Sequence, residues 1–82
     1  EHESEPWYLR GLALQKLNRL TDARDALERS VNIAPTLALA WHRLGLVYSG
    51  LGMTAQAQSV QRRLRQLNPD LALQLAKSLL PN

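Results

Sequence analysis

Two histidines are the side chains best suited to acid–base or metal chemistry at neutral pH. His2 lies in the acidic run that opens the sequence, and His42 lies within residues 41–48. Neither has a second ligand at metal-site spacing, and no carboxylate lies within one helical turn of His42. There is no cysteine, no serine in a nucleophile-elbow context and no glycine-rich phosphate loop. We therefore expect no catalysis and no cofactor, and we interpret His42 as a contact residue.

Arginine side chains are the second candidate for chemistry, because guanidinium groups pair with phosphates and carboxylates. Arg62, Arg63 and Arg65 cluster in one short stretch, and Arg29 precedes Arg63 by 34 positions. Nucleic-acid binding needs such a basic patch. However, no aromatic side chain lies among these arginines to stack a base, which weakens a single-strand platform. We therefore keep nucleic-acid binding only as the alternative function.

Length and charge are those of one small domain, with 82 residues and a formal net charge of +3 at pH 7. Residues 1–28 carry four basic and six acidic side chains, whereas residues 29–82 carry six basic and one acidic. A basic second half favours an acidic partner, although a solvated helix surface explains it more simply. Polar residues interrupt every apolar stretch, so we expect no membrane span. Because the first residue is Glu1, we interpret the chain as a fragment or processed form and leave its compartment open.

Apolar residues recur at helical spacing along the sequence, which predicts five helices joined by short turns and packed antiparallel. The expected helices run from Ser4 to about Leu17, from Thr21 to Pro35, from Leu37 to Gly50, from Thr54 to Pro69, and from Leu71 to Leu80. Small polar residues favour helix N-caps. The expected N-caps are Ser4, Thr21, Thr36, Thr54 and Asp70.

A 34-residue repeat organises these helices, because residues 4–37 and 38–71 share eight identities in one register. The identical pairs are Trp7/Trp41, Gly11/Gly45, Leu12/Leu46, Leu17/Leu51, Ala23/Ala57, Arg29/Arg63, Pro35/Pro69 and Leu37/Leu71. Glycine has no side chain, so a partner helix can approach it closely, and we expect the alanine of each unit to meet it there. The tryptophan fills the space between helices, and the proline ends each unit.

This pattern resembles the tetratricopeptide repeat family, which has a 34-residue helix–turn–helix unit with Trp, Leu-Gly, Tyr, Ala, an aromatic, Ala and Pro at fixed places. The second unit matches at Trp41, Leu44, Gly45, Tyr48, Ala57 and Pro69, and departs at Gln61 and Leu64. The first unit matches at Trp7, Gly11, Ala23 and Pro35, and departs at Arg10, Leu14, Leu27 and Ser30. An unrelated five-helix bundle is the competing interpretation, which the shared register disfavours.

The resemblance implies an all-α, five-helix solenoid of helical hairpins wound as a right-handed superhelix. Its expected parts are a lead-in at residues 1–3, repeats at 4–37 and 38–71, and a C-terminal capping helix at 72–82. It also implies an adaptor or scaffold that binds a protein or peptide partner on its concave face. The implied lining residues are Glu5, Tyr8, Leu12, Gln15, Leu39, His42, Leu46, Ser49, Leu73, Ala76 and Leu80.

Leucines recur along this expected face: Leu12, Leu46 and Leu80 share one repeat position, and Leu39 and Leu73 share another. We favour an apolar groove for a helix or an extended segment, against the alternative that neighbouring side chains cover the leucines as ordinary core.

Two basic residues, Arg43 and Lys77, share a further repeat position beside the groove. They are candidates for holding an acidic side chain or a terminal carboxylate of a partner, although simple solubilising charge explains them too. Some family members bind the carboxyl-terminal tails of heat-shock chaperones through a clamp of Lys and Asn. The corresponding positions here are Tyr8, Leu12, His42 and Leu46, so that activity is not carried over.

The expected fifth helix carries leucines around most of its circumference, namely Leu71, Leu73, Leu75, Leu79 and Leu80. A terminal helix of a repeat array needs a polar outer face. We therefore expect this helix to be covered further, and predict self-association of the chain through it.

Overall fold

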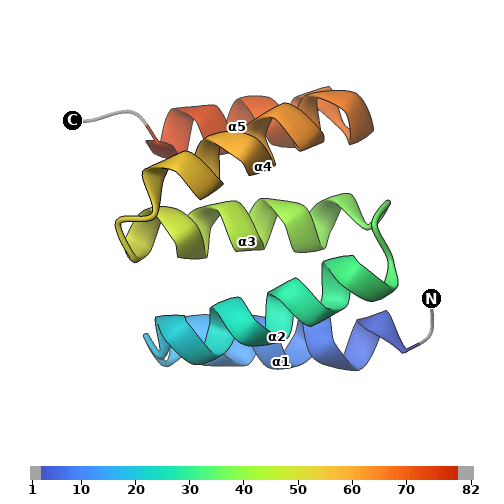
Figure 1. The fold of residues 1–82 in the computed structure, drawn as a ribbon, viewed down its shortest axis with the longest axis vertical. Coiled ribbons are helices and arrows are strands. Elements are labelled where there is room, and N and C mark those ends of the chain that lie inside the picture. Colours follow the sequence, from blue (N-terminus) through green and yellow to red (C-terminus); the bar gives the residue numbers. More distant parts are fainter. Residues whose placement is uncertain (1–2, 80–82) are drawn as a thin grey trace.

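In the computed structural model, residues 3–79 are described, and this part of the chain consists of five α-helices without a strand. The helices are α1 (Ser4–Lys16), α2 (Leu20–Ile33), α3 (Ala38–Gly50), α4 (Thr54–Leu67) and α5 (Pro69–Leu79). Consecutive helices run antiparallel and stack in chain order, from α1 at one end to α5 at the other (Figure 1). The prediction of an all-α chain of sequential hairpins is confirmed.

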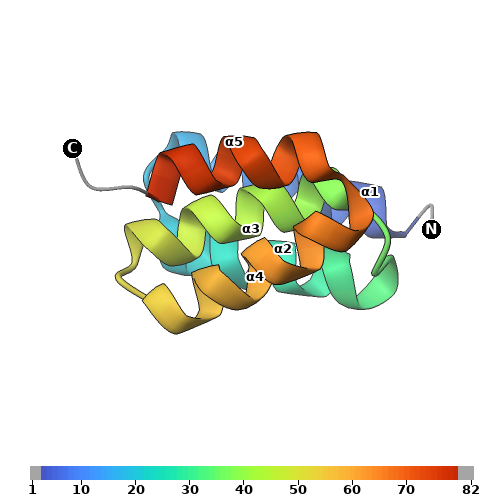
Figure 2. The same ribbon diagram turned by 90° about the horizontal axis from the view of Figure 1, so that it is seen from above.

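The helices form a thin stack with extents of 34 × 27 × 17 Å. Seen from above, α2 and α4 lie toward one side, α1 and α5 lie toward the other, and α3 lies between them (Figure 2). Both α1 and α5 pack against α3, but they do not pack against each other. On the surface formed by α1, α3 and α5, α3 is therefore recessed between the other two helices.

The predicted helix N-caps are wrong. Ser4 is already helical, and its hydroxyl lies 2.9 Å from the Ser30 hydroxyl in a buried contact between α1 and α2. The residues at the cap positions of α2, α3 and α4 are Arg19, Leu37 and Met53, and none of them makes a side-chain cap hydrogen bond. At α5 the cap is supplied by Asn68 rather than by Asp70, because the Leu71 amide donates to Asn68 Oδ1 over 3.1 Å. The turn geometry therefore decides where each helix begins.

The two hairpin turns share one backbone conformation. Asn18 follows α1 with a φ of 60°, and Gly52 follows α3 with a φ of 75°. These residues are 34 positions apart, so each unit reverses through a left-handed residue at the same repeat position. Asparagine and glycine are the residues that adopt this conformation most readily. The chain therefore turns at residues 17–18 and 51–52, and Gly50 still belongs to α3.

Close helix packing depends on the two repeated glycines, but the expected neighbours were wrong. A Cβ atom on Gly11 would lie 2.5 Å from Leu27 Cγ on α2. A Cβ atom on Gly45 would lie 2.6 Å from Leu75 Cδ2 on α5. Both leucines are fully buried. Leucine side chains, rather than the small alanines at 23 and 57, therefore occupy the space that each glycine leaves.

Burial differs between equivalent positions of the two units. Leu44 and Val47 on α3 belong to the buried core, and α2 packs against that helix. The residues 34 positions earlier, Arg10 and Ala13 on α1, are exposed. Arg10 stands where the motif has leucine because no helix of the described chain covers that side of α1. The departure from the motif at Arg10 therefore reflects the place of α1 at the end of the stack of helices.

Side-chain hydrogen bonds join the two units. The Tyr48 hydroxyl on α3 donates to Glu28 Oε2 on α2, and Trp41 Nε1 donates to the Pro35 carbonyl over 2.7 Å. Burial, followed by the Glu28 carboxylate, raises the pKa of Tyr48 above its usual range, so the phenol stays protonated as a donor. These bonds fix α3 against α2 and the loop between them.

Replacing Gly11 with alanine should destabilise the fold. The new methyl group would overlap Leu27 Cγ, and overpacking of this kind costs about 1–3 kcal/mol. The higher helix propensity of alanine returns about 1 kcal/mol. We expect the free energy of unfolding, measured by urea denaturation, to fall, whereas Gly50→Ala should not lower it because its Cβ would meet only the end of the Leu20 side chain. Equal stability of Gly11→Ala and the parent chain would contradict the contact.

Tyr48→Phe removes the phenol hydroxyl and leaves the Glu28 carboxylate without its hydrogen bond from α3. A hydrogen bond to a charged group contributes about 1.5–3 kcal/mol. Because Glu28 is only half-buried, we expect a loss near the lower limit of that range in urea denaturation. A double-mutant cycle with Glu28→Gln should show coupling between the two positions. Additive effects would show that the bond contributes nothing.

Candidate functional site

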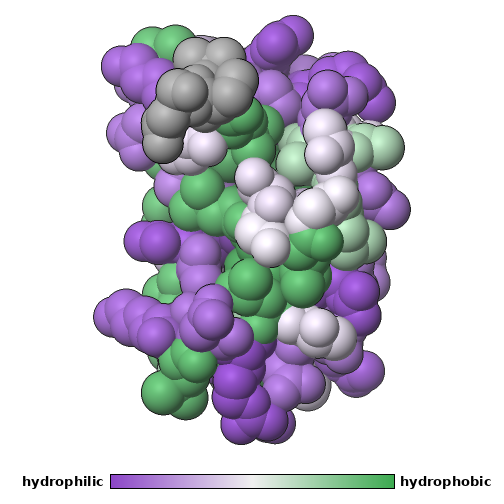
Figure 3. Space-filling view, turned by 90° about the vertical axis from the view of Figure 1, so that its left-hand side faces the viewer, coloured by the Kyte–Doolittle hydropathy of each residue, from purple (hydrophilic) through white to green (hydrophobic). Residues whose placement is uncertain are grey.

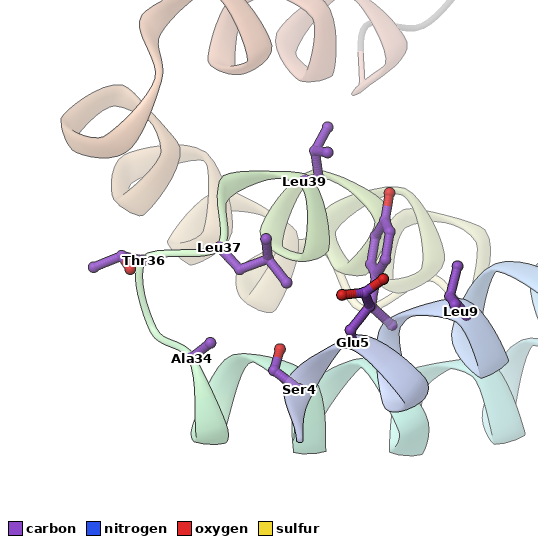
Figure 4. A pocket seen from close by; sticks show the side chains of 8 residues that line it. Ser4, Glu5, Leu9, Ala34, Thr36, Leu37 and Leu39 are labelled. Atoms are coloured by element: carbon purple, nitrogen blue, oxygen red, sulfur yellow. The ribbon is translucent and has the colours of Figure 1, made fainter. Parts of the chain in front are cut away.

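A hollow of about 380 Å³ opens between the first turns of α1 and α3 (Figure 4). It is lined by Ser4, Glu5, Tyr8, Leu9, Ala34, Thr36, Leu37 and Leu39. Leu37 points toward Ser4 and Glu5, whereas Leu39 points away from them (Figure 4). The wall therefore combines two helix starts with the loop between α2 and α3.

The chemistry of this hollow is mainly apolar. Leu9 and Leu39 are 54% and 49% exposed, so both side chains present apolar surface here. The buried Ser4 hydroxyl is already bonded to Ser30, so the exposed carboxylate of Glu5 is the charged group at the rim. Such a surface can receive an apolar side chain and can pair with a donor beside it.

Only part of the predicted lining set meets in this hollow, namely Glu5, Tyr8 and Leu39. The partly buried residues Leu12, Gln15, His42, Arg43 and Leu46 lie on α1 and α3 outside it. Ser49, Leu73 and Lys77 are exposed on α3 and α5, Ala76 lies between α4 and α5, and Leu80 falls outside the described residues. The predicted set lacks Ser4 and Leu9 on α1, and it lacks Ala34, Thr36 and Leu37 because they lie in the loop after Ile33 and not on a helix face.

The expected band of leucines is not uniform. Leu46 is partly buried and packs against the core, and Leu12 is also partly buried. Leu39 and Leu73 remain 49% and 58% exposed. Core packing therefore accounts for part of the band, and the exposed apolar surface is concentrated at Leu39 and Leu73.

A second apolar surface lies on the side that carries the two hairpin turns. There Leu17 is 68% exposed, while Leu20, Leu51 and Met53 are partly buried against the core. Viewed from this side, hydrophobic surface gathers toward the middle and hydrophilic surface toward the edges (Figure 3). Leu20 and Leu51 therefore cover the core between the turns, whereas Leu17 presents apolar surface to solvent.

His42 lies beside Arg43 on α3. Burial, followed by the Arg43 charge, lowers the pKa of the His42 imidazole from its usual value and so favours the neutral form. A neutral imidazole can both donate and accept one hydrogen bond. This state suits the predicted role of a contact residue, which stays a prediction.

The arginines are divided among different surfaces, and aromatic rings do lie beside two of them. The Arg29 guanidinium lies 4.7 Å from the ring centre of Trp7, and the Arg63 guanidinium lies 5.8 Å from that of Trp41. The premise that no aromatic accompanies the arginines was wrong, because residues distant in sequence meet across each hairpin. Arg62 and Arg65 instead line a furrow between α4 and α5.

Within residues 3–79, no group of three or more histidine, aspartate or glutamate side chains is placed to hold a metal ion. The same part of the chain has no helix with the length and apolar character needed to cross a bilayer.

His42 should make stability depend on pH. Its folded pKa lies below 6.5, so the unfolded chain binds the proton more readily, and stability falls as the pH falls through 6.5. Above this value the contribution of His42 is constant. Denaturation measured between pH 8 and pH 5 should show a smaller loss for His42→Gln than for the parent chain. An identical pH dependence in both chains would show that the imidazole titrates normally.

Comparison with protein families finds the tetratricopeptide repeat at residues 4–37 and again at residues 38–71. Comparisons with curated proteins and with solved structures returned no match. A fifth helix consistent with a capping helix follows the two matched units, although α5 begins at Pro69, inside the second match. Tetratricopeptide repeats form superhelical arrays, generally act as protein–protein interaction modules and are typically not catalytic. The chain belongs to the tetratricopeptide repeat family.

Proposed function

We propose that this chain is a non-catalytic adaptor or scaffold module that binds a peptide or helix segment of a partner protein on the surface of α1 and α3. The observation that carries the proposal is the exposed apolar pair, Leu9 and Leu39, around the hollow between those helices. An exposed apolar patch with a polar rim is characteristic of an interaction site. The first partner contact is an apolar side chain seated beside Tyr8.

Polar groups on the same helices would set the orientation of the bound segment. Glu5 at the rim suits a basic side chain or an N-terminal amine of the partner. Arg43 on α3 and Lys77 on α5 remain candidates for an acidic side chain, and His42 and Gln15 for hydrogen bonds to the bound main chain. Pairs of exposed charges contribute little affinity, so we assign them to orientation.

Leu39→Glu tests this surface without removing a buried side chain. Burial of one leucine contributes about 1.5–3 kcal/mol, which corresponds to about tenfold or more in affinity. A blocked amphipathic peptide with leucines at helical spacing serves as the probe, and its binding is followed by amide chemical shifts. We expect the shifts to map to the hollow and the affinity to fall at least tenfold in Leu39→Glu.

Leu17→Glu is the matched control, because Leu17 is equally apolar and more exposed but lies outside the hollow. It should leave the affinity unchanged. Shifts that map to the hairpin turns, or an equal loss in both variants, would remove the α1–α3 surface from consideration. Leu46→Glu is a poorer test, since Leu46 packs against the core.

Nucleic-acid binding is retained as the second candidate because of the pairing of Arg29 with Trp7 and of Arg63 with Trp41. A base can stack on an aromatic ring while a neighbouring guanidinium pairs with its phosphate. Arg62 and Arg65 lie in a different furrow, so the four arginines do not form one continuous platform. This division is why a protein partner is favoured. Self-association through α5 also remains a prediction, but Leu75 is buried and Leu71 and Leu79 pack against the core, which reduces the apolar surface available.

A further inference from the structure

Gln61 on α4 is a buried polar residue without a hydrogen-bond partner. The residue is only 9% exposed, and its Oε1 atom has no partner in the structure. At the equivalent position of the first unit, Leu27 is buried completely. A buried polar atom left unpaired costs about 1–3 kcal/mol, so leucine would be the more stable choice for packing alone.

The reason that Gln61 remains unpaired lies in the packing of α5. In the first unit Leu27 fills the space over Gly11, but at Gly45 this space is taken by Leu75 from α5 and by Val60. Gln61 is therefore not needed to fill the space over the second glycine. Its amide is left beside the junction of α4 and α5.

A furrow of about 370 Å³ opens at that junction. It is lined by Gln58, Gln61, Arg62, Arg65, Ala76 and Leu79. The four residues from α4 follow one another at spacings of three, one and three positions, so they form a single stripe along that helix. The furrow thus combines amide and guanidinium groups on one wall with small apolar groups on the other.

The charge of the furrow is uncompensated. Neither Arg62 nor Arg65 forms an ion pair with any described residue, and the Arg62 guanidinium donates only to Ser59 Oγ, over 3.2 Å. Both arginines are exposed. Asp70 is the only acidic residue among positions 29–82. The complementary ligand is therefore anionic.

We propose that the furrow between α4 and α5 is a second binding site, for an extended acidic peptide segment. Carboxylates of the segment pair with Arg62 and Arg65, because guanidinium groups bind carboxylates in a planar, two-pronged geometry. A main-chain carbonyl of the segment accepts a hydrogen bond from the Gln61 side-chain nitrogen, because Gln61 Oε1 is itself shielded from solvent. An apolar side chain of the segment lies against Ala76 and Leu79. The site is separate from the hollow between α1 and α3, so it stands or falls independently of that surface.

The test uses the full 82-residue chain and a terminally blocked pentapeptide with a central leucine flanked by glutamates. Binding is followed through the side-chain amide resonance of Gln61, which a contact elsewhere would not move. The resonance should shift on titration, and the affinity should fall with added salt. Arg62→Gln combined with Arg65→Gln should reduce the affinity at least tenfold.

Gln61→Leu separates binding from folding. It should raise the resistance of the chain to urea, because it removes the unpaired buried amide, and should weaken peptide binding at least tenfold. Arg10→Gln combined with Lys16→Gln removes the same charge from exposed positions on α1 and should leave the affinity nearly unchanged. A matched peptide with lysines in place of the glutamates should not bind.

Three outcomes would overturn the proposal. The Gln61 resonance could stay unmoved while the peptide saturates the protein. A short thymidine oligonucleotide could shift that resonance at lower concentration than the peptide, which would assign the furrow to nucleic acid. The resonance could also move with protein concentration alone, which would assign it to a second copy of the chain.

Discussion

The contact between a leucine and a helical glycine is the constraint on which this structure depends. Leu27 sits over Gly11 in the first unit, and Leu75 sits over Gly45 in the second. Each contact lets two helices approach to a distance that any larger residue would prevent. In the second unit the leucine comes from α5, so that helix completes the core instead of merely ending the stack. Because Leu75 of α5 takes the place over Gly45, α5 packs closely against α3, and it also packs against α4.

The presence of Leu75 instead of residue 61 over Gly45 also affects where polar side chains lie. Because Leu75 fills the space above Gly45, Gln61 no longer has to be apolar, and the adjacent stripe of α4 carries Arg62 and Arg65. The side formed by the starts of α1 and α3 instead carries exposed leucines and the acidic rim residue Glu5. A small repeat domain can thus present an apolar surface and a basic surface on different helices. Solenoids permit this because each element contacts only its neighbours and leaves other faces open.

Much of the architecture follows from periodicity alone. Recurrence at 34 positions predicted the units, and apolar residues at helical spacing predicted the five helices. Helix starts were predicted poorly, because cap preference is a local rule whereas the turn is set by residues such as Asn18 that adopt a left-handed conformation. Ser4 illustrates the error: its hydroxyl bonds across to Ser30 rather than to its own helix end. Of the predicted lining residues, the hollow gathers Glu5, Tyr8 and Leu39, because the loop between α2 and α3 closes it on one side.

The amino-acid sequence by itself determined the repeat, the number of helices in residues 3–79 and the family. Spacing along a helix specifies which residues share a face, and a glycine specifies where a neighbour can approach. Only the tertiary structure decided which side chain packs against each glycine. It brought Arg29 beside Trp7, buried Leu75 while leaving Leu73 exposed, and left the Gln61 amide unpaired. These outcomes depend on how one helix packs against another, and no local pattern contains that information because each side chain's partners come from distant parts of the chain.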